Sequence, residues 1–267
     1  MSLGQPRMSK KDDRPISYFD KFVQMNKRVC DSIERLLPQQ FTRSLLYRHE
    51  LVAAEKMNAR AGQIVVDIGG GHQAPFARHR QRDLNTFIAG VDILPSQVRG
   101  NSSIDAGVVA DVGKTIPFYD KSVDIFVTRS VIEHLPDNDG LFNEMARCLK
   151  KGGYSINVLP CCFSPFSIIN RLLPPNIAKR LLYALFPQWR DSCGFEPFYR
   201  NCYFPRLIEL IKQSGLSPEQ VEYRYYQSIY FKFFVPFFII SLIYDLILWA
   251  FGIRLLAAQM LVVARKD

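Results

Sequence analysis

The stretch Ile64-Val65-Val66-Asp67-Ile68-Gly69-Gly70-Gly71 decides the fold class of this chain. A short apolar run rich in β-branched residues leads directly into three glycines, as in a buried strand that ends in a tight turn. Glycine lets the backbone bend sharply and approach a ligand where a Cβ atom would clash. If a helix follows, its N-terminus can face a polar or charged group of that ligand. The stretch therefore predicts a ligand-binding turn at the end of a strand.

Short β-rich runs separated by turn residues continue along the chain. The runs expected to form strands are 64–68, 87–92, 107–111, 123–128, 154–158, 221–226 and 259–264. A helical stretch over 141–149 separates the fourth run from the fifth. Strands that alternate with helices predict a parallel sheet covered on both faces. With 267 residues, 48% of them hydrophobic, the chain fits one α/β domain with extra segments.

Residues before the first strand have helical spacing instead. Apolar side chains recur over 19–36 and 45–57, with Pro38 between the two sets. We therefore expect an N-terminal helical cap over 1–60, followed by the sheet domain over 61–267. The polar N-terminus has no apolar run, so we expect no secretory signal.

An acidic residue ends the second predicted strand. Asp92 lies 25 positions after Asp67, close to the spacing of a carboxylate that accepts hydrogen bonds from ribose hydroxyls. Together with the glycine turn, Asp92 indicates a nucleoside-containing ligand.

Two motifs further along the chain narrow the choice of ligand. The fourth predicted strand runs into Glu133-His134-Leu135-Pro136-Asp137, and residues 144–153 read E-M-A-R-C-L-K-K-G-G. In this order the motifs resemble the class I S-adenosylmethionine-dependent methyltransferases, closely over about 60–160 and more loosely through the last two strands. The resemblance implies a Rossmann-like seven-stranded mixed sheet with helices on both faces, and S-adenosylmethionine as cofactor.

The resemblance also implies roles for individual residues. Asp67, Gly69, Gly70 and Gly71 would form the turn around the methionine and ribose parts of the cofactor. The other implied cofactor-binding residues are Asp92 and Ile93 at the ribose, Asp111 and Val112 at the adenine, and Arg129 and Ser130 along the cofactor. Many relatives have a third glycine where this chain has Gln73, which departs from the family pattern.

A dinucleotide-binding dehydrogenase is the competing interpretation. Its G-x-G-x-x-G/A pattern can be fitted to Gly69, Gly71 and Ala74, so the glycines alone do not exclude it. The E-H-L-P-D and K-K-G-G segments favour the methyltransferase.

His134 is the candidate catalytic residue. Methyl transfer from a sulfonium often depends mostly on positioning, and where the acceptor is a hydroxyl, a general base can remove its proton. Histidine suits that role by its pKa, and His134 follows the fourth strand, where such sheets bind their reactive ligands. The alternative is that Glu133 braces the turn and His134 packs or bonds to the backbone. Relatives that bind a metal have E-x-x-E-H, but Ser130 occupies the first place here, so we expect no metal site.

Several other polar residues are weaker candidates. His72 follows the glycine turn, and Tyr199 and Arg200 could face an acceptor from a lid expected at about 160–203. We expect His79 to be exposed and His49 to be packed or solvated. We predict that the lid contains two short amphipathic helices separated by Pro174-Pro175.

Charge and cysteine content limit the partners. The net charge of +9 is concentrated in the flanks, +5 over 1–60 and +5 over 161–267, whereas 61–160 carries −1. Basic residues beside aromatic sequence suggest a membrane surface or an anionic substrate, and no nucleic-acid partner is expected. The six cysteines form no C-x-x-C pair, so we expect reduced thiols and neither zinc nor a disulfide framework.

A long apolar insertion, about 231–256, precedes the last strand. Its core, 233–253, is long enough to span a membrane, but Pro236 and Asp245 interrupt it. A single span would also place the last two strands on opposite sides of the bilayer. We therefore expect a cytoplasmic protein held peripherally on the inner face of a membrane by an interfacial element. The alternative is a helix buried in the core or in a dimer interface.

The acceptor is the least determined part of the prediction. We expect transfer of a methyl group to an oxygen of a lipid or lipid-linked glycan. A ring carbon of a quinone or other isoprenoid, and a catalytically silent cofactor-binding partner protein, stay open as alternatives.

Overall fold

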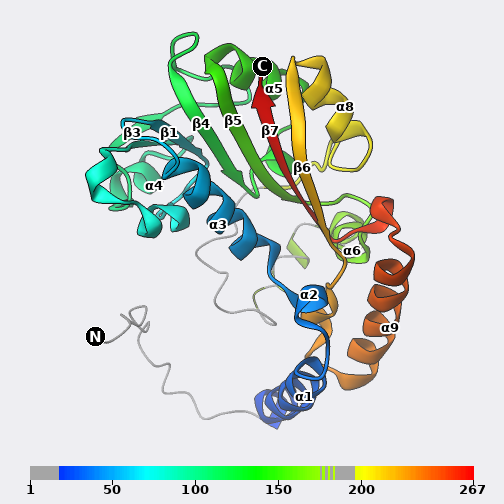
Figure 1. The fold of residues 1–267 in the computed structure, drawn as a ribbon. Helices are drawn as coiled ribbons and strands as arrows, with labels where there is room; N and C mark the ends of the chain where they lie inside the picture. Colours follow the sequence, from blue (N-terminus) through cyan, green and yellow to red (C-terminus); the bar gives the residue numbers. More distant parts are fainter. Residues whose placement is uncertain (1–17, 175, 178–179, 181–182, 184–195) are drawn as a thin grey trace.

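A seven-stranded sheet forms the centre of the computed structural model, which describes residues 18–174, 176–177, 180, 183 and 196–267 (Figure 1). The strand order is β3-β2-β1-β4-β5-β7-β6. The strands through β5 are parallel, and β7 runs antiparallel to both β5 and β6. This confirms the predicted mixed sheet. The bounds are β1 (Ile64–Ile68), β2 (Phe87–Asp92), β3 (Ala106–Val109), β4 (Val123–Arg129), β5 (Leu149–Pro160), β6 (Leu216–Arg224) and β7 (Gln259–Lys266).

Helices cover both faces of the sheet because its residues alternate between two apolar cores. Val66 and Phe126 pack on the face covered by α5 (Asp139–Cys148) and α8 (Arg206–Gln213). Their neighbours Val65 and Ile125 pack on the opposite face, against α3 (Leu45–Met57). Successive side chains of a β-strand point to opposite faces of the sheet. The short helix α4 (Pro95–Gly100) connects β2 to β3.

A short 3-10 helix, Pro75–His79, follows the glycine turn. Two details differ from the prediction. Strand β5 begins at Leu149, the last residue of the predicted helical stretch, and contains the glycine pair Gly152-Gly153. These glycines fit a register shift opposite Val123 and Ile125, where a Cβ on Gly153 would lie 2.8 Å from the carbonyl oxygen of Asp124. Strand β6 covers 216–224 and not 221–226.

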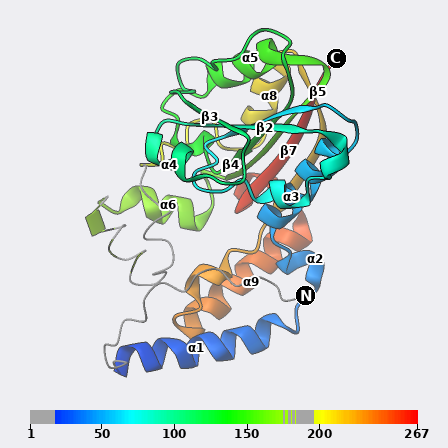
Figure 2. The ribbon, with the colours of Figure 1, turned by 90° about the vertical axis from the view of Figure 1, so that its left-hand side faces the viewer.

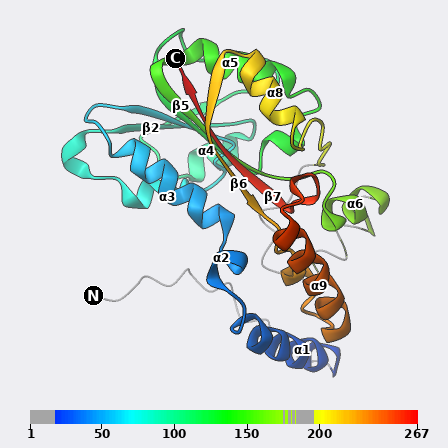
Figure 3. The same cartoon turned by 45° about the vertical axis from the view of Figure 1, so that its right-hand side comes forward.

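A second group of helices lies beyond the edge at which β1, β2, β4 and β5 end, which we call the carboxyl edge. Figures 2 and 3 show α1 (Tyr18–Glu34), α2 (Gln39–Thr42), α6 (Pro165–Leu172) and α9 (Val235–Phe251) on this side of the sheet. Short 3-10 helices, Ser228–Phe231 and Arg254–Leu256, flank α9. The second amphipathic helix predicted for the lid lies largely outside the described residues.

Helix α9 is continuous, so Pro236 and Asp245 interrupt the apolar sequence of the insertion but not its helix. Pro236 occupies the first turn of α9, where a missing N–H costs nothing. Asp245 is fully buried and turned toward the protein, where it accepts hydrogen bonds from the amides of Gln227 (2.8 Å) and Ser228 (2.9 Å) and from the Ser228 hydroxyl (2.6 Å). Within the described part of the chain, no helix combines the length and apolarity needed to cross a membrane.

Candidate cofactor-binding site

The glycine turn surrounds a buried carboxyl group. Asp67 is 3% exposed, and its Oδ2 has no hydrogen-bond partner among the described residues. Burial raises the pKa of Asp67 to about 8, and nearby Asp92 adds to the increase, whereas Arg129 opposes it. A Cβ on Gly70 would lie 2.1 Å from Oδ2 of Asp67. Glycine at position 70 therefore leaves room for this carboxyl, which is able to bind a ligand's donor.

The neighbouring glycines bring the turn close to the adjoining segments. Gly69 has φ +66° and Gly71 has φ +55°, a region that L side chains rarely adopt. A Cβ on Gly69 would lie 2.4 Å from a methyl group of Val131, so the turn packs tightly against the chain that follows β4. The side-chain amide of Asn101 donates to the carbonyl of Gly71 over 3.0 Å.

Asp92 ends β2 beside this turn. Its Oδ1 accepts from the amide of Leu94 (2.9 Å), and its Oδ2 accepts from the amide of Gly71. Each carboxylate oxygen has a second lone pair, so Asp92 keeps acceptor capacity for a hydroxyl pair. Ile93 is about half exposed next to it. This geometry fits the ribose role that the resemblance implies.

The remaining predicted cofactor residues follow β3 and β4 at the same edge. Asp111 is partly exposed; its Oδ1 accepts from the amide of Gly113 (3.1 Å), and its Oδ2 lies 3.5 Å from Nζ of Lys114. Val112 packs at the margin of the core. Ser130 adopts φ +54°, an unusual backbone conformation for serine, directly after the exposed Arg129. The carboxyl edge therefore brings the predicted cofactor residues together.

His134 lies under the described end of the lid. Its Nδ1 is 3.2 Å from the carbonyl oxygen of Glu196. Because a carbonyl can only accept, Nδ1 donates in this contact, and Nε2 is the ring nitrogen that accepts. Burial lowers the pKa of His134 below its ordinary value, which favours the neutral ring. A neutral imidazole with an accepting nitrogen is the form that a general base requires.

Glu133 joins the lid to the segment after β4. Its carbonyl accepts from the amides of Phe198 (2.8 Å) and Tyr199 (3.0 Å), while its side chain is 3% exposed. Burial raises the pKa of that side chain to about 8. The fully buried Asn138 adds a second attachment, because its side-chain amide donates to the carbonyl of Arg200 (2.5 Å).

The weaker candidates have separate environments. His49 is buried beside the carbonyl of Ile156 on the far face of the sheet, and burial lowers its pKa to about 4. Arg200 faces Asp137 and Asp139, and Tyr199 is buried with Arg171 over its ring. His72 is exposed, and His79 lies beside Glu50. Glu133, Asn138 and Asn101 are not among the site residues predicted from the sequence.

The five described cysteines are reduced. Cys30, Cys148, Cys161, Cys162 and Cys202 are buried free thiols, and Cys193 lies outside the described residues. Among the residues described, no cluster of three or more His, Cys, Asp or Glu side chains could hold a metal ion.

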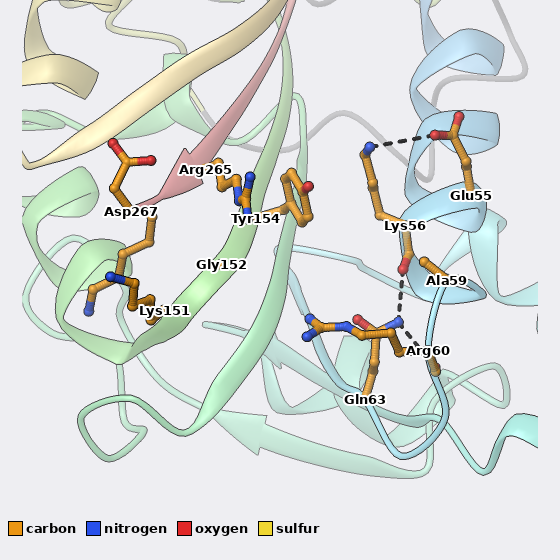
Figure 4. A pocket seen from close by; sticks show the side chains of 11 residues that line it. Glu55, Lys56, Ala59, Arg60, Gln63, Lys151, Gly152, Tyr154, Arg265 and Asp267 are labelled. Carbon is orange, nitrogen blue, oxygen red and sulfur yellow. Dashed lines mark hydrogen bonds and ion pairs between the residues drawn. The ribbon is translucent and has the colours of Figure 1, made fainter.

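A cavity of about 670 Å³ opens at the opposite edge of the sheet. Its lining includes Lys56, Arg60, Tyr154 and Arg265, and Lys56 is paired with Glu55 (Figure 4). Because these residues lie near the start of β1 and the end of β7, the cavity is remote from the glycine turn. The candidate site is therefore defined by its polar residues and not by this cavity.

Comparison with known proteins agrees with the geometry of the carboxyl edge. A family model described as a methyltransferase domain matches residues 66–157, which include the glycine turn, Asp92 and His134. This match identifies residues 66–157 as a methyltransferase domain. An uncharacterized methyltransferase of Mycobacterium sp. (strain JLS) is 34% identical over 110 residues. That match covers 39% of this chain and 42% of the relative, so the chain spans less than half of the relative's length.

Two solved structures share the fold of this methyltransferase domain. Phosphoethanolamine N-methyltransferase 2 of Haemonchus contortus, in complex with S-adenosyl-L-methionine, has a TM-score of 0.52 at 16% identity, over 83% of this chain and 52% of that one. Geranyl diphosphate C-methyltransferase of Streptomyces coelicolor A3(2), in complex with S-adenosyl-L-homocysteine, has a TM-score of 0.53 at 14% identity, over 98% and 90%. S-adenosylmethionine is the cofactor of this family.

The residues of the methyltransferase domain fit that cofactor. A buried carboxyl oxygen without a described partner, a glycine turn that a Cβ would fill and an acidic strand end lie together at the carboxyl edge. Asp67 and the glycines would hold the methionine and ribose parts, and Asp92 would hold the ribose hydroxyls. Asp111 and Val112 would hold the adenine.

Proposed function

We propose that this protein methylates an oxygen of a lipid or lipid-linked glycan at a membrane surface, with S-adenosylmethionine as the methyl donor. The bound cofactor would supply an electrophilic methyl group on its sulfonium. The observation that carries the proposal is the location of the site beside apolar helices. The carboxyl edge is also the side of the sheet on which α1, α6 and α9 expose large apolar side chains (Figure 1). An acceptor held in lipid would reach the cofactor from that side.

His134 would act as the general base. A hydroxyl acceptor would give its proton to Nε2 of His134 as the oxygen is methylated, so that the product oxygen stays neutral. The contact of Nδ1 with the Glu196 carbonyl favours the tautomer that this step needs. The attachment of Phe198 and Tyr199 to Glu133 would hold the lid over the ring and help to exclude water.

Carbon methylation of a quinone or other isoprenoid is the second candidate. The apolar helices at the carboxyl edge suit an isoprenoid as well as they suit a lipid, and the fold is shared with a geranyl diphosphate C-methyltransferase. A catalytically silent binding protein is a weaker candidate, because the glycine turn, Asp67 and Asp92 are all present. The site of the new methyl group on the product distinguishes the two enzymatic candidates.

The test is a methyl-transfer assay with S-adenosylmethionine labelled in the methyl group and vesicles of a bacterial total lipid extract. We expect label in the organic phase, on an alkali-stable ether or a labile ester oxygen. Calorimetry with S-adenosylmethionine, S-adenosylhomocysteine and NAD runs in parallel. NAD binding without binding of the sulfur nucleosides would overturn the reaction class, and label on carbon would favour the second candidate.

His134→Ala tests the base, with His79→Ala as the matched control. We expect the first variant to bind the cofactor normally and to lose most of its turnover, on the order of 100-fold or more. In the wild type, turnover should fall as the pH drops through the pKa of His134, because only the neutral ring accepts the proton. Equal turnover of His134→Ala and wild type would return His134 to a packing role.

A further inference from the structure

Helices α1 and α9 form a fixed pair although some 200 residues separate them in sequence. Nζ of Lys232, just before α9, makes an ion pair with Asp31 of α1 at 2.8 Å and a second one with Glu34. The side-chain oxygen of Asn26 accepts from the amide of Val235 over 3.0 Å. Cys30, Phe238 and Leu242 share a small apolar core between the helices. We call this unit the α1–α9 pair.

The outer face of α9 is apolar along its whole length. Five of its exposed large side chains recur every three or four residues, as one face of a helix does, and are Phe237, Ile240, Ile243, Ile247 and Phe251; Trp249 is exposed beside them. Ile240 is 66% exposed and Phe251 is 78% exposed, whereas Asp245, the only charged residue of α9, is fully buried on another face. Apolar surface of this extent is unusual on a protein face that meets only water.

A similar stripe follows α1 and continues past its end. The exposed members of this stripe are spaced at four, three, four and seven residues and are Tyr18, Phe22, Met25, Val29 and Leu36. The ring of Phe22 lies 6.3 Å from that of Phe234, which lies 5.0 Å from that of Phe237. Through these rings, the stripe of α1 is continuous with the outer face of α9.

A row of basic residues borders the α1 stripe. Lys21, Arg28 and Arg35 are exposed and seven residues apart, so they lie along one line on the helix, about 80° from the stripe. None of the three has an ion pair with any residue that the structure describes. The acidic residues Asp31 and Glu34 lie on the side of α1 away from the stripe and pair with Lys232. The α1 stripe is therefore an apolar surface with basic residues along one side.

We infer that the α1–α9 pair is a docking surface for a bilayer that contains anionic lipids. The apolar stripe would enter the boundary between headgroups and acyl chains, and Lys21, Arg28 and Arg35 would contact lipid phosphates. Charge complementarity decides for lipid over a second copy of the chain or another protein, because an apolar protein interface would cover the stripe without using three cations in line. The inference rests on the proposed function only in that the same membrane would supply the acceptor.

The test is sedimentation of the full chain, without cofactor, with vesicles of phosphatidylcholine alone and of phosphatidylcholine mixed with phosphatidylglycerol. Each cation near an anionic surface changes partitioning about fivefold, so Lys21→Gln/Arg28→Gln/Arg35→Gln should weaken binding to mixed vesicles about 100-fold. The matched control replaces three exposed basic residues elsewhere, Arg82, Lys121 and Lys212, with Gln and should bind as the wild type does. Circular dichroism melts verify that both variants fold.

A second variant tests the apolar half of the surface. Ile240→Ser/Phe251→Ser should lose binding to both vesicle types while keeping its melting temperature, because both side chains are exposed. Equal wild-type binding to both vesicle types, or an unchanged triple variant, would overturn the lipid specificity. A wild-type dimer that binds no vesicle and dissociates in the Ser variant would show that the surface joins two copies.

Vesicle binding and methyl transfer fail independently. Vesicle binding without methyl transfer to lipid would contradict the proposed acceptor and leave the docking surface intact. Methyl transfer to a lipid dispersed in detergent, without vesicle binding, would support the proposed function and overturn the docking surface.

Discussion

The backbone amide of Gly71 donates a hydrogen bond to Oδ2 of Asp92 over 3.3 Å, so the glycine turn after β1 is joined directly to the end of β2. These residues are 21 positions apart, and parallel pairing of β1 with β2 brings them to one edge. The same carboxylate that would bind ribose hydroxyls therefore also orders the turn that would surround them.

Asp92→Ala should weaken binding of S-adenosylmethionine. Loss of charge-assisted hydrogen bonds to hydroxyls corresponds to about 1–3 kcal/mol, or roughly 5- to 150-fold in Kd. Isothermal titration calorimetry measures the change. Asp83→Ala, at an exposed acid far from the carboxyl edge, is the control and should bind as the wild type does. An unchanged Kd for Asp92→Ala would contradict the ribose assignment.

Gly70→Ala should abolish cofactor binding. Its Cβ would lie 2.1 Å from Oδ2 of Asp67, so either the carboxyl or the turn must move out of position. Gly140→Ala is the matched control, because a Cβ there meets nothing within 4 Å and alanine favours the first turn of α5. We expect calorimetry to detect binding for the control alone. Wild-type affinity in Gly70→Ala would show that the position of Asp67 is not needed.

The contribution of Asp67 to the stability of the ligand-free protein should fall as the pH rises from about 4 to about 8. Unfolded Asp67 releases its proton near its ordinary pKa of 3.8, whereas burial holds its folded pKa at about 8. In this window the folded state binds the extra proton, so the free energy of unfolding decreases with pH. Buried Glu133, with a pKa of about 8, acts in the same direction.

Asp67→Asn removes the contribution of Asp67 to the decrease of the free energy of unfolding with pH. Urea unfolding should find the variant about as stable as wild type near pH 4, and more stable near pH 8 by about 1–3 kcal/mol, the usual cost of an unsatisfied buried polar group. Asp83→Asn should follow the wild-type curve throughout. Parallel curves for Asp67→Asn and wild type would contradict the raised pKa.

Asp245→Ala should destabilise the region around α9. The carboxylate accepts hydrogen bonds from two backbone amides and one hydroxyl, and its removal leaves these buried donors without their partner, at a cost of about 2–4 kcal/mol. Asp245→Asn keeps one accepting oxygen and should cost less. Hydrogen exchange of the amides of Gln227 and Ser228 reports the loss locally. Equal protection in all three proteins would show that Asp245 does not hold this segment.

The fold and the cofactor side of the site were predictable because local signals determine them. Runs of buried β-branched residues fixed the strands, and a glycine turn between a strand and an acidic strand end fixed the edge where a ligand would bind. Asp67, Asp92 and Asp111 each follow or end a strand, so parallel pairing alone brings them together.

The attachments of the lid could not be predicted in the same way. Asn138 binds the carbonyl of Arg200, 62 residues later, and Glu133 accepts from Phe198 and Tyr199, so these roles exist only after the lid has folded back. The structural role of Asp245 was also hidden in the sequence. In sequence it interrupts an apolar run, but its backbone partners come from a turn 17 residues earlier that periodicity does not reveal.

The pairing of α1 with α9 determines when the docking surface can exist during synthesis. Lys232 must meet Asp31 across 201 positions, so a nascent chain would present the α1 stripe long before α9 has been translated. At a synthesis rate of about 5–20 residues per second, that delay is on the order of 10–40 seconds. Chaperones would meet an unpaired amphipathic helix throughout this interval, and membrane recruitment would be a property of the finished chain.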